Sequence, residues 1–172
     1  MNSGHFYAAL LIGSNFQRSK NFKKGLSLLE SSYKILKRSR IYKSDDILQK
    51  GKFYWNLGVL IELHEISLLK NDMLKIEKEC KRRKGTMKQI ITIDIDVVLV
   101  YKRSCSAGNY KLIMKNIEDS LYSSLILKEI VPKSLLSDNF PEQKSSAGSI
   151  IKKRNLNFMP ITEISSPYEK IP

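Results

Sequence analysis

Two aspartates placed two residues apart are the groups of this chain whose chemistry is most specific. Asp94 and Asp96 belong to the segment 92–96, TIDID, which runs on into the apolar residues VVLV. Side chains alternate along a strand, so a strand here points both carboxylates to one face, about 7 Å apart. Such carboxylates repel each other unless a cation or a basic group lies between them. The pair suits Mg²⁺, which takes one or two carboxylates together with substrate phosphates; two solvated aspartates on an exposed strand face are the alternative.

The strong positive charge of the chain favours anionic partners. Thirty Lys and Arg against seventeen Asp and Glu give a net charge of +13 and a pI near 9.7. Nucleotides, nucleic acids and membrane surfaces all fit this charge, and composition alone does not choose among them. The lysines are scattered, and only residues 81–84, KRRK, form a dense basic run. This scatter weakens a nucleic-acid interpretation.

Composition also bounds the class of protein. A chain of 172 residues is long enough for one domain with a real core. No apolar run approaches the roughly 18 residues that a membrane span needs. Cys80, Cys105, His5 and His64 stand apart from one another, without the spacing of a zinc site. We therefore expect a reduced, cytoplasmic protein without zinc and without a membrane partner.

Hydrophobic periodicity predicts alternating strands and helices. The expected elements are a strand at 5–13, a helix at 20–35, strands at 35–42 and 53–63, a helix at 66–82, the strand with the two aspartates, and a helix at 117–127. The first six follow the order strand-helix-strand-strand-helix-strand. This order predicts an α+β fold of the ferredoxin-like type, a four-stranded antiparallel sheet (βαββαβ) with both helices on one face.

The C-terminal part of the chain has a different composition. Beyond about Ser137 it is rich in Ser, Pro, Lys and Asn, with sparse apolar residues. We expect a folded domain over residues 1–136, followed by a C-terminal extension, 137–172, that packs loosely or is disordered.

Five short segments together resemble one enzyme family. They are residues 11–15 (LIGSN), 39–44 (SRIYKS), 53–56 (FYWN), the pair Ile76-Glu77 followed by Arg82, and residues 92–96 (TIDID). Each is weak alone, but their order and separations over about residues 5 to 132 resemble hydroxymethyl-dihydropterin pyrophosphokinase of folate biosynthesis, as a divergent member.

The resemblance implies a Mg²⁺-dependent enzyme. Members of the family move a pyrophosphoryl group from ATP, the co-substrate, to the hydroxymethyl group of the pterin and leave AMP. Two Mg²⁺ ions would be held by Asp94 and Asp96 and would bridge the triphosphate. Phosphoryl transfer depends mainly on positioning and on neutralised charge, which agrees with such a site.

The same resemblance assigns residues to the pterin. Asn56 would match the family's asparagine, whose amide both donates hydrogen bonds to the ring and accepts them from it. Ser44 and Asp45 would line the pterin through their backbone, and Tyr122 would stack on it. A tyrosine on a helix is more often part of a core, so packing is the alternative for Tyr122.

On the nucleotide side, the resemblance implies Glu77, Arg82, Lys84 and Lys111. Arg82 would join the two aspartates as a catalytic residue. A solvated helix end with a favourable basic C-terminus is the alternative for Glu77 and Arg82.

The chain departs from the family where the family binds the triphosphate. In place of an Arg-Trp-Gly-Pro-Arg loop, residues 87–91 read MKQII, so Ile91 stands where an arginine is usual. A Pro-His segment is replaced around Met114, and a later arginine position falls on Ser120. One lost phosphate contact of this kind costs on the order of 2–4 kcal/mol in the transition state.

Three functions are therefore weighed. The first is a working pyrophosphokinase that uses ATP and the pterin as a monomer or weak dimer. The second is a catalytically impaired relative that binds pterin or nucleotide without turnover. The third is an RNA-binding module, which needs exposed aromatics within a Lys/Arg-Gly-Phe motif; residues 53–55, FYW, lack the glycine. We therefore consider nucleic acid an unlikely partner.

Overall fold

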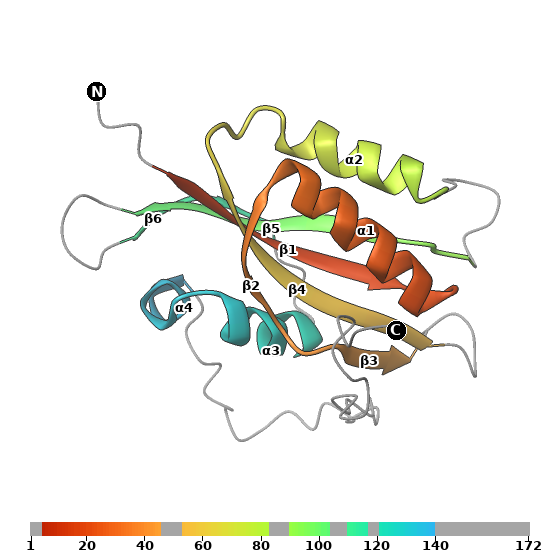
Figure 1. Ribbon diagram of the computed structural model, residues 1–172. Helices are drawn as coiled ribbons and strands as arrows, with labels where there is room; N and C mark the ends of the chain where they lie inside the picture. The colour runs from red at the N-terminus through yellow and green to blue at the C-terminus, as the bar shows by residue number, and fades with distance from the viewer. Residues whose placement is uncertain (1–4, 46–52, 83–89, 104–109, 117–120, 140–172) are drawn as a thin grey trace, which may run out of the picture.

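An antiparallel sheet with helices on both faces organises the chain (Figure 1). The computed structural model describes residues 5–45, 53–82, 90–103, 110–116 and 121–139. The strands are β1 (Phe6–Ser14), β2 (Lys34–Arg38), β3 (Tyr42–Asp45), β4 (Phe53–Leu63), β5 (Asp94–Arg103) and β6 (Tyr110–Lys115). Their order is β2-β4-β1-β5-β6, and β3 also pairs with β4. All pairs are antiparallel.

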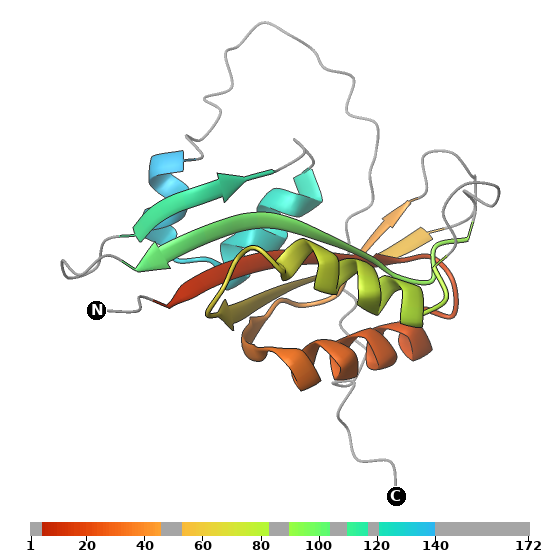
Figure 2. The same cartoon turned by 90° about the horizontal axis from the view of Figure 1, so that it is seen from above.

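Four helices cover the two faces of the sheet. They are α1 (Arg18–Ser32), α2 (Leu69–Glu79), α3 (Leu121–Ile130) and α4 (Lys133–Asn139). In both views α1 and α2 lie side by side on one face, and α3 and α4 lie on the other (Figures 1 and 2). The sheet therefore has a buried core on each side, one under α1 and α2 and one under α3 and α4.

The central strand β1 is buried on both faces because its sequence is a continuous apolar run. Ala8, Leu10 and Ile12 belong to the core under α1 and α2, whereas Ala9 belongs to the core under α3. All four are at most 1% exposed. Even-numbered β1 residues from 8 to 12 therefore pack toward α1 and α2, whereas Ala9 packs toward α3.

A bulge in β5 determines how the two aspartates are presented. Ala9 pairs with Leu99 and Leu10 with Val97, so Val98 is an extra residue in β5. Before the bulge, Asp96 pairs with Leu11, which packs against the core under α3. Directly paired residues share a face, so the aspartate side of β5 is the α3 face.

The prediction of an antiparallel α+β sheet is confirmed, with additions. The sheet has six strands instead of four, and α3 and α4 cover a face that was expected to lack helices. The strand expected at 35–42 is two strands, β2 and β3. The Ser39 amide still donates to the Gly58 carbonyl of β4, but the Gly58 amide bonds the Ser39 hydroxyl in place of a backbone carbonyl. The Arg40 amide donates to Glu129 on α3, so the strand pairing is interrupted there.

The helices lie close to their expected positions, and β4 has the expected bounds, 53–63. The predicted domain boundary at residue 136 falls inside α4. Residues 140–172, which make up most of the predicted extension, lie outside the described part of the chain. Within the described ranges, no helix is long and apolar enough to cross a membrane.

Candidate active site

Three strands place an amide, a glycine and a carboxylate side by side on the α3 face. Gly13 of β1 pairs with Asn56 of β4 on one side and with Asp94 of β5 on the other. Paired residues share a face, so the Asn56 amide and the Asp94 carboxylate flank a position without a side chain. A Cβ at Gly13 would meet one described atom within 4 Å, Asn56 Oδ1 at 3.6 Å. Among the described residues, Gly13 thus leaves an open floor between the two polar groups.

Strand β3 fixes the amide of Asn56. Tyr42 pairs with Asn56, and Ser44 pairs with Tyr54 one pleat further on. The Asn56 side chain is 8% exposed. Its Nδ2 donates to the Ser44 hydroxyl at 2.8 Å and to the Tyr42 carbonyl at 3.4 Å. The NH₂ group is therefore engaged by β3, and Oδ1 is directed over Gly13.

Two further residues assigned to the pterin lie near this group in the fold. The backbone of Asp45 pairs with Phe53 at the end of β3. Tyr122 lies in the first turn of α3, and α3 begins at the end of the sheet where β3 lies (Figure 1). The side chains of Asp45 and Tyr122 are outside the described part of the structure.

On the other side of Gly13, Arg82 connects Asp94 to α2. The Arg82 Nη1 group donates to Asp94 Oδ1 and to Glu77 Oε1. Glu77 Oε1 also accepts the Ile95 amide at 2.9 Å. Among the described residues, β6 pairs with β5 only from Leu99 onward, so Glu77 covers the edge of β5 that precedes this pairing.

The charges of this group depend on one another. Burial raises the pKa of Glu77 above its ordinary value, and the Ile95 amide and Arg82 oppose this, while Asp94 adds to it. Burial lowers the pKa of Arg82, but the attraction of Asp94 and Glu77 outweighs it, so the net shift is upward. The guanidinium is thus a cation held between two carboxyl groups.

The exposure and charge of Asp94, Asp96 and Arg82 determine whether a divalent cation can bind here. Asp94 is 31% exposed and Asp96 is exposed on the same face, so both reach solvent. Arg82 already places a positive charge against Asp94, as a metal ion would. In the described ranges, no three His, Cys, Asp or Glu side chains gather into a metal site. A cation held here would take two carboxylates and complete its shell with substrate oxygens and water, as Mg²⁺ does.

The structure does not bring Lys111 to this group. Lys111 pairs with Lys102, eight positions along β5 from Asp94. At about 3.3 Å per residue this is roughly 25 Å. A contact between Lys111 and a nucleotide at Asp94 is therefore not supported, because β6 pairs with the far end of β5. Lys84 and Ser120 lie outside the described residues, and Met114 is exposed opposite Val100.

The Gly-Ser-Asn turn after β1 has a role that the sequence did not reveal. The Asn15 amide donates to the Ile91 carbonyl at 3.0 Å, and Asn15 Oδ1 accepts the Ile91 amide at 2.7 Å. The Ser14 hydroxyl donates to the same carbonyl at 3.3 Å. Both backbone groups of Ile91 are therefore bound three residues before Asp94. The Gly-Ser-Asn motif was recognisable in the sequence, but only the structure shows that it binds the backbone of Ile91.

Most of the chain matches the model of one protein family. A search of the curated proteins finds no match to the chain. The family model of 7,8-dihydro-6-hydroxymethylpterin-pyrophosphokinase (HPPK) matches residues 9–137. The match covers β1 to α4 almost completely, and therefore includes Asn56, Gly13 and Asp94. The chain belongs to the 7,8-dihydro-6-hydroxymethylpterin-pyrophosphokinase family.

Proposed function

We propose that this protein transfers a pyrophosphoryl group from ATP to the hydroxymethyl oxygen of 6-hydroxymethyl-7,8-dihydropterin, with Mg²⁺ bound. One observation carries the proposal: Asn56 and Asp94 face the same open floor from the two sides of Gly13. A flat ring with amide groups needs polar partners at its edge, and a phosphate chain needs a cation near its reacting end. Family membership and the β2-β4-β1-β5 order, with α1 and α2 on one face, support a ferredoxin-like core that carries this site.

The pterin would lie on the Asn56 side. Two strand spacings, about 10 Å, separate Asn56 from Asp94, which leaves room for a bicyclic ring above Gly13. Asn56 Oδ1 would accept a ring N–H, while Ser44 and the backbone of Asp45 would form the wall beyond it. Tyr122 would close the site from α3. The hydroxymethyl group would then point toward Asp94.

Asp94 and Asp96 would hold the metal. Two Mg²⁺ ions at this position would neutralise the triphosphate and orient it for in-line transfer. With a metal ion bound to Asp94, the Arg82 guanidinium, which donates to Asp94 Oδ1, would be free to bind a phosphate instead. Glu77 keeps its bond to the Ile95 amide and so holds the edge of β5 in place. Lys84 would contribute further positive charge to the nucleotide.

A second candidate function is binding of the pterin or nucleotide without turnover. The residues expected to contact the ATP phosphates favour it. By the family resemblance, Ile91 would stand where an arginine is usual; its backbone is bound to Asn15. Lys111, which could have compensated for this loss, lies at the distant end of β5. Losing several charge-assisted phosphate contacts slows transfer while leaving the pterin half intact.

Release of AMP from ATP tests both candidates. The wild type should form AMP only when Mg²⁺ and the pterin are both present. D94N should reduce the rate at least about 100-fold, as removal of a metal ligand does. D72N is the matched control, because Asp72 is also an ion-paired aspartate but lies on α2, and it should keep the wild-type rate.

The assay separates the outcomes. Pterin binding without AMP formation at millimolar ATP and Mg²⁺ would identify an impaired relative. A wild-type protein that neither binds the pterin nor forms AMP would refute the proposed function.

A further inference from the structure

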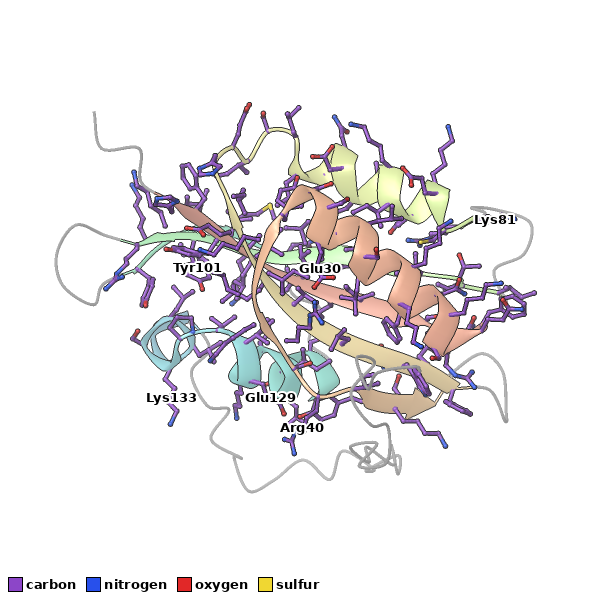
Figure 3. The ribbon with its side chains drawn as sticks, in the orientation of Figure 1. Glu30, Arg40, Lys81, Tyr101, Glu129 and Lys133 are labelled. Carbon is purple, nitrogen blue, oxygen red and sulfur yellow. The ribbon has the colours of Figure 1, made fainter. Side chains whose placement is uncertain are left out.

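Glu129 joins helix α3 to the segment that leads into β3. Its carboxylate accepts from the Arg40 backbone amide and from Arg40 Nε, both at 2.8 Å, and forms an ion pair with Arg40 Nη2 at 2.6 Å. The Tyr42 hydroxyl donates to it as well. Figure 3 shows Glu129 and Arg40 close together on the α3 face. One carboxylate therefore accepts three hydrogen bonds and forms an ion pair with two residues of a neighbouring segment.

Tyr42 extends this network into the candidate site. It is 5% exposed and pairs directly with Asn56. Its carbonyl accepts from Asn56 Nδ2, and the other contact of that amide is Ser44, two residues further along β3. A path of hydrogen bonds and backbone thus runs from Glu129 through Tyr42 to the Asn56 amide.

Other described contacts of α3 include a hydrogen bond from Lys37 Nζ to the Glu129 carbonyl at 3.5 Å and close apolar packing on β4. Ile126 and Ile130 pack on Gly58, where an added Cβ would lie 2.3 Å from Ile126 Cγ2. Apolar packing of this kind sets how closely the helix approaches, but it is non-directional. Charge-assisted hydrogen bonds add direction. The Glu129 carboxylate therefore gives α3 a directional, charge-assisted contact with the segment that leads into β3.

The Glu129 carboxyl is suited to this role because it is ionised and partly shielded. Its side chain is 22% exposed. Burial raises its pKa, but the hydrogen bonds from Tyr42 and Arg40 outweigh burial, and the pKa lies below its ordinary value. The charge is therefore present throughout the neutral range.

We propose that Glu129 is a positioning residue for the pterin half of the site. It holds β3, with Ser44 and the amide of Asn56, at a fixed distance from the first turn of α3, where Tyr122 stands. This inference rests on the proposed function, because it concerns where that substrate lies. Glu129 acts on the pterin through these groups and does not touch it.

Separate titrations of two ligands test the proposal. E129Q should weaken the binding of 6-hydroxymethylpterin, followed by its fluorescence, about tenfold, which is the loss expected for a charged hydrogen-bond network. ATP affinity should stay within about twofold, since the nucleotide side lies across Gly13. A purely structural role for Glu129 would weaken both ligands alike.

Asp72 provides a matched control on the opposite face. Its carboxylate accepts from the Tyr33 hydroxyl at 2.7 Å and from Lys75 at 3.0 Å, so it too joins a helix carboxylate to a tyrosine and a basic side chain. D72N should leave the affinity for both ligands unchanged. Equal loss of pterin affinity in D72N and E129Q would overturn the proposal.

Hydrogen exchange supplies a measurement that needs no ligand. The amides of residues 42–45 should exchange faster in E129Q than in the wild type, and D72N should not change them. The proposal would also be overturned if the amides of residues 42–45 exchanged in E129Q as in the wild type, or if E129Q bound the pterin with wild-type affinity. Absence of pterin binding by the wild type would instead refute the proposed function, and the exchange measurement would still decide the role of Glu129.

A milder variant covers the case in which E129Q does not fold. Y42F removes one donor and leaves the contacts between Glu129 and Arg40 in place. It should weaken pterin binding about threefold, with ATP affinity unchanged. Wild-type pterin affinity in Y42F would contradict the proposed path through Tyr42.

Discussion

At the scale of residues, the candidate site consists of a few polar side chains whose hydrogen-bond partners are fixed. Asn56 keeps its NH₂ group on β3 and its oxygen over Gly13, so one amide both braces the sheet and faces the candidate substrate. Asp94 shares Arg82 with Glu77, so a guanidinium stands where we propose that a metal ion binds. Each group can be tested by its own substitution.

Replacing Arg82 tests the cation at Asp94. R82Q leaves the carboxyl of Glu77, which is 4% exposed, beside Asp94 without the intervening charge. We expect the free energy of unfolding to fall by roughly 3 kcal/mol, as when one partner of a buried pair is removed. Millimolar Mg²⁺ should restore more stability to R82Q than it adds to the wild type, because the ion replaces the lost positive charge. Urea unfolding with and without Mg²⁺ measures both effects, and equal effects of Mg²⁺ on both proteins would contradict the metal assignment.

The pH dependence of stability tests the charge of Glu129. Its pKa is lowered in the folded protein, so the unfolded chain binds more protons in the window below the ordinary glutamate value of about 4.3. The stabilisation is therefore complete above that window and is lost as the pH falls through the lowered folded pKa. E129Q should cost about 1 kcal/mol at pH 7, and this difference should shrink as the pH falls toward 3. Urea unfolding at several pH values checks this; a difference that stays constant from pH 7 to pH 3 would show that the charge is not involved.

The sequence predicted part of this site, and the reason for its limit is physical. Alternation along one strand places Asp94 and Asp96 on one face, because that property is local. Gly13 gained meaning only when the register placed it between two other strands. Glu129 contacts residues almost ninety positions away, so no local pattern could reveal it. Lys111 was misplaced because nearness to other site residues in the sequence does not fix strand register.

At the scale of elements, the close approach of α3 to β4 is the contact that shapes the pterin side. Gly58 allows this approach, since an added Cβ would lie 2.3 Å from Ile126 Cγ2 and 3.0 Å from Ile130 Cδ1. G58A should destabilise the protein by about 1–3 kcal/mol through overpacking. It should also lift α3 from the sheet and weaken pterin binding more than ATP binding. Thermal unfolding and the two titrations measure these effects, and an equal loss for both ligands would contradict the placement of the pterin under α3.

Long apolar elements were predicted well, and short ones were not. The eleven residues of β4 and the fifteen of α1 carry enough periodicity to be recognised, because each buries a continuous face. The six residues of β6 include a bulge at Ile113, and α4 has only seven residues. Tertiary packing against the sheet decides such short segments, so their local sequence gave no clear prediction.

At the scale of the whole molecule, the two faces of the sheet have different roles. The face under α1 and α2 carries the larger apolar core, and the face under α3 carries the candidate site at one end. Both sheet edges contain bulges, which place Leu36 in β2 and Ile113 in β6 as extra, exposed residues. Such bulges discourage edge-to-edge pairing between molecules. The oligomeric state, expected to be a monomer or weak dimer, stays a prediction.

We propose that the pterin lies on Gly13, between Asn56 and Asp94. G13V tests it most directly, because a β-branched residue suits a strand and its Cβ meets only Asn56 Oδ1 among the described atoms within 4 Å. Fluorescence titration of 6-hydroxymethylpterin should show wild-type binding and a loss of at least about tenfold in G13V, with ATP affinity and thermal unfolding little changed. Wild-type pterin affinity in a folded G13V protein would contradict the account.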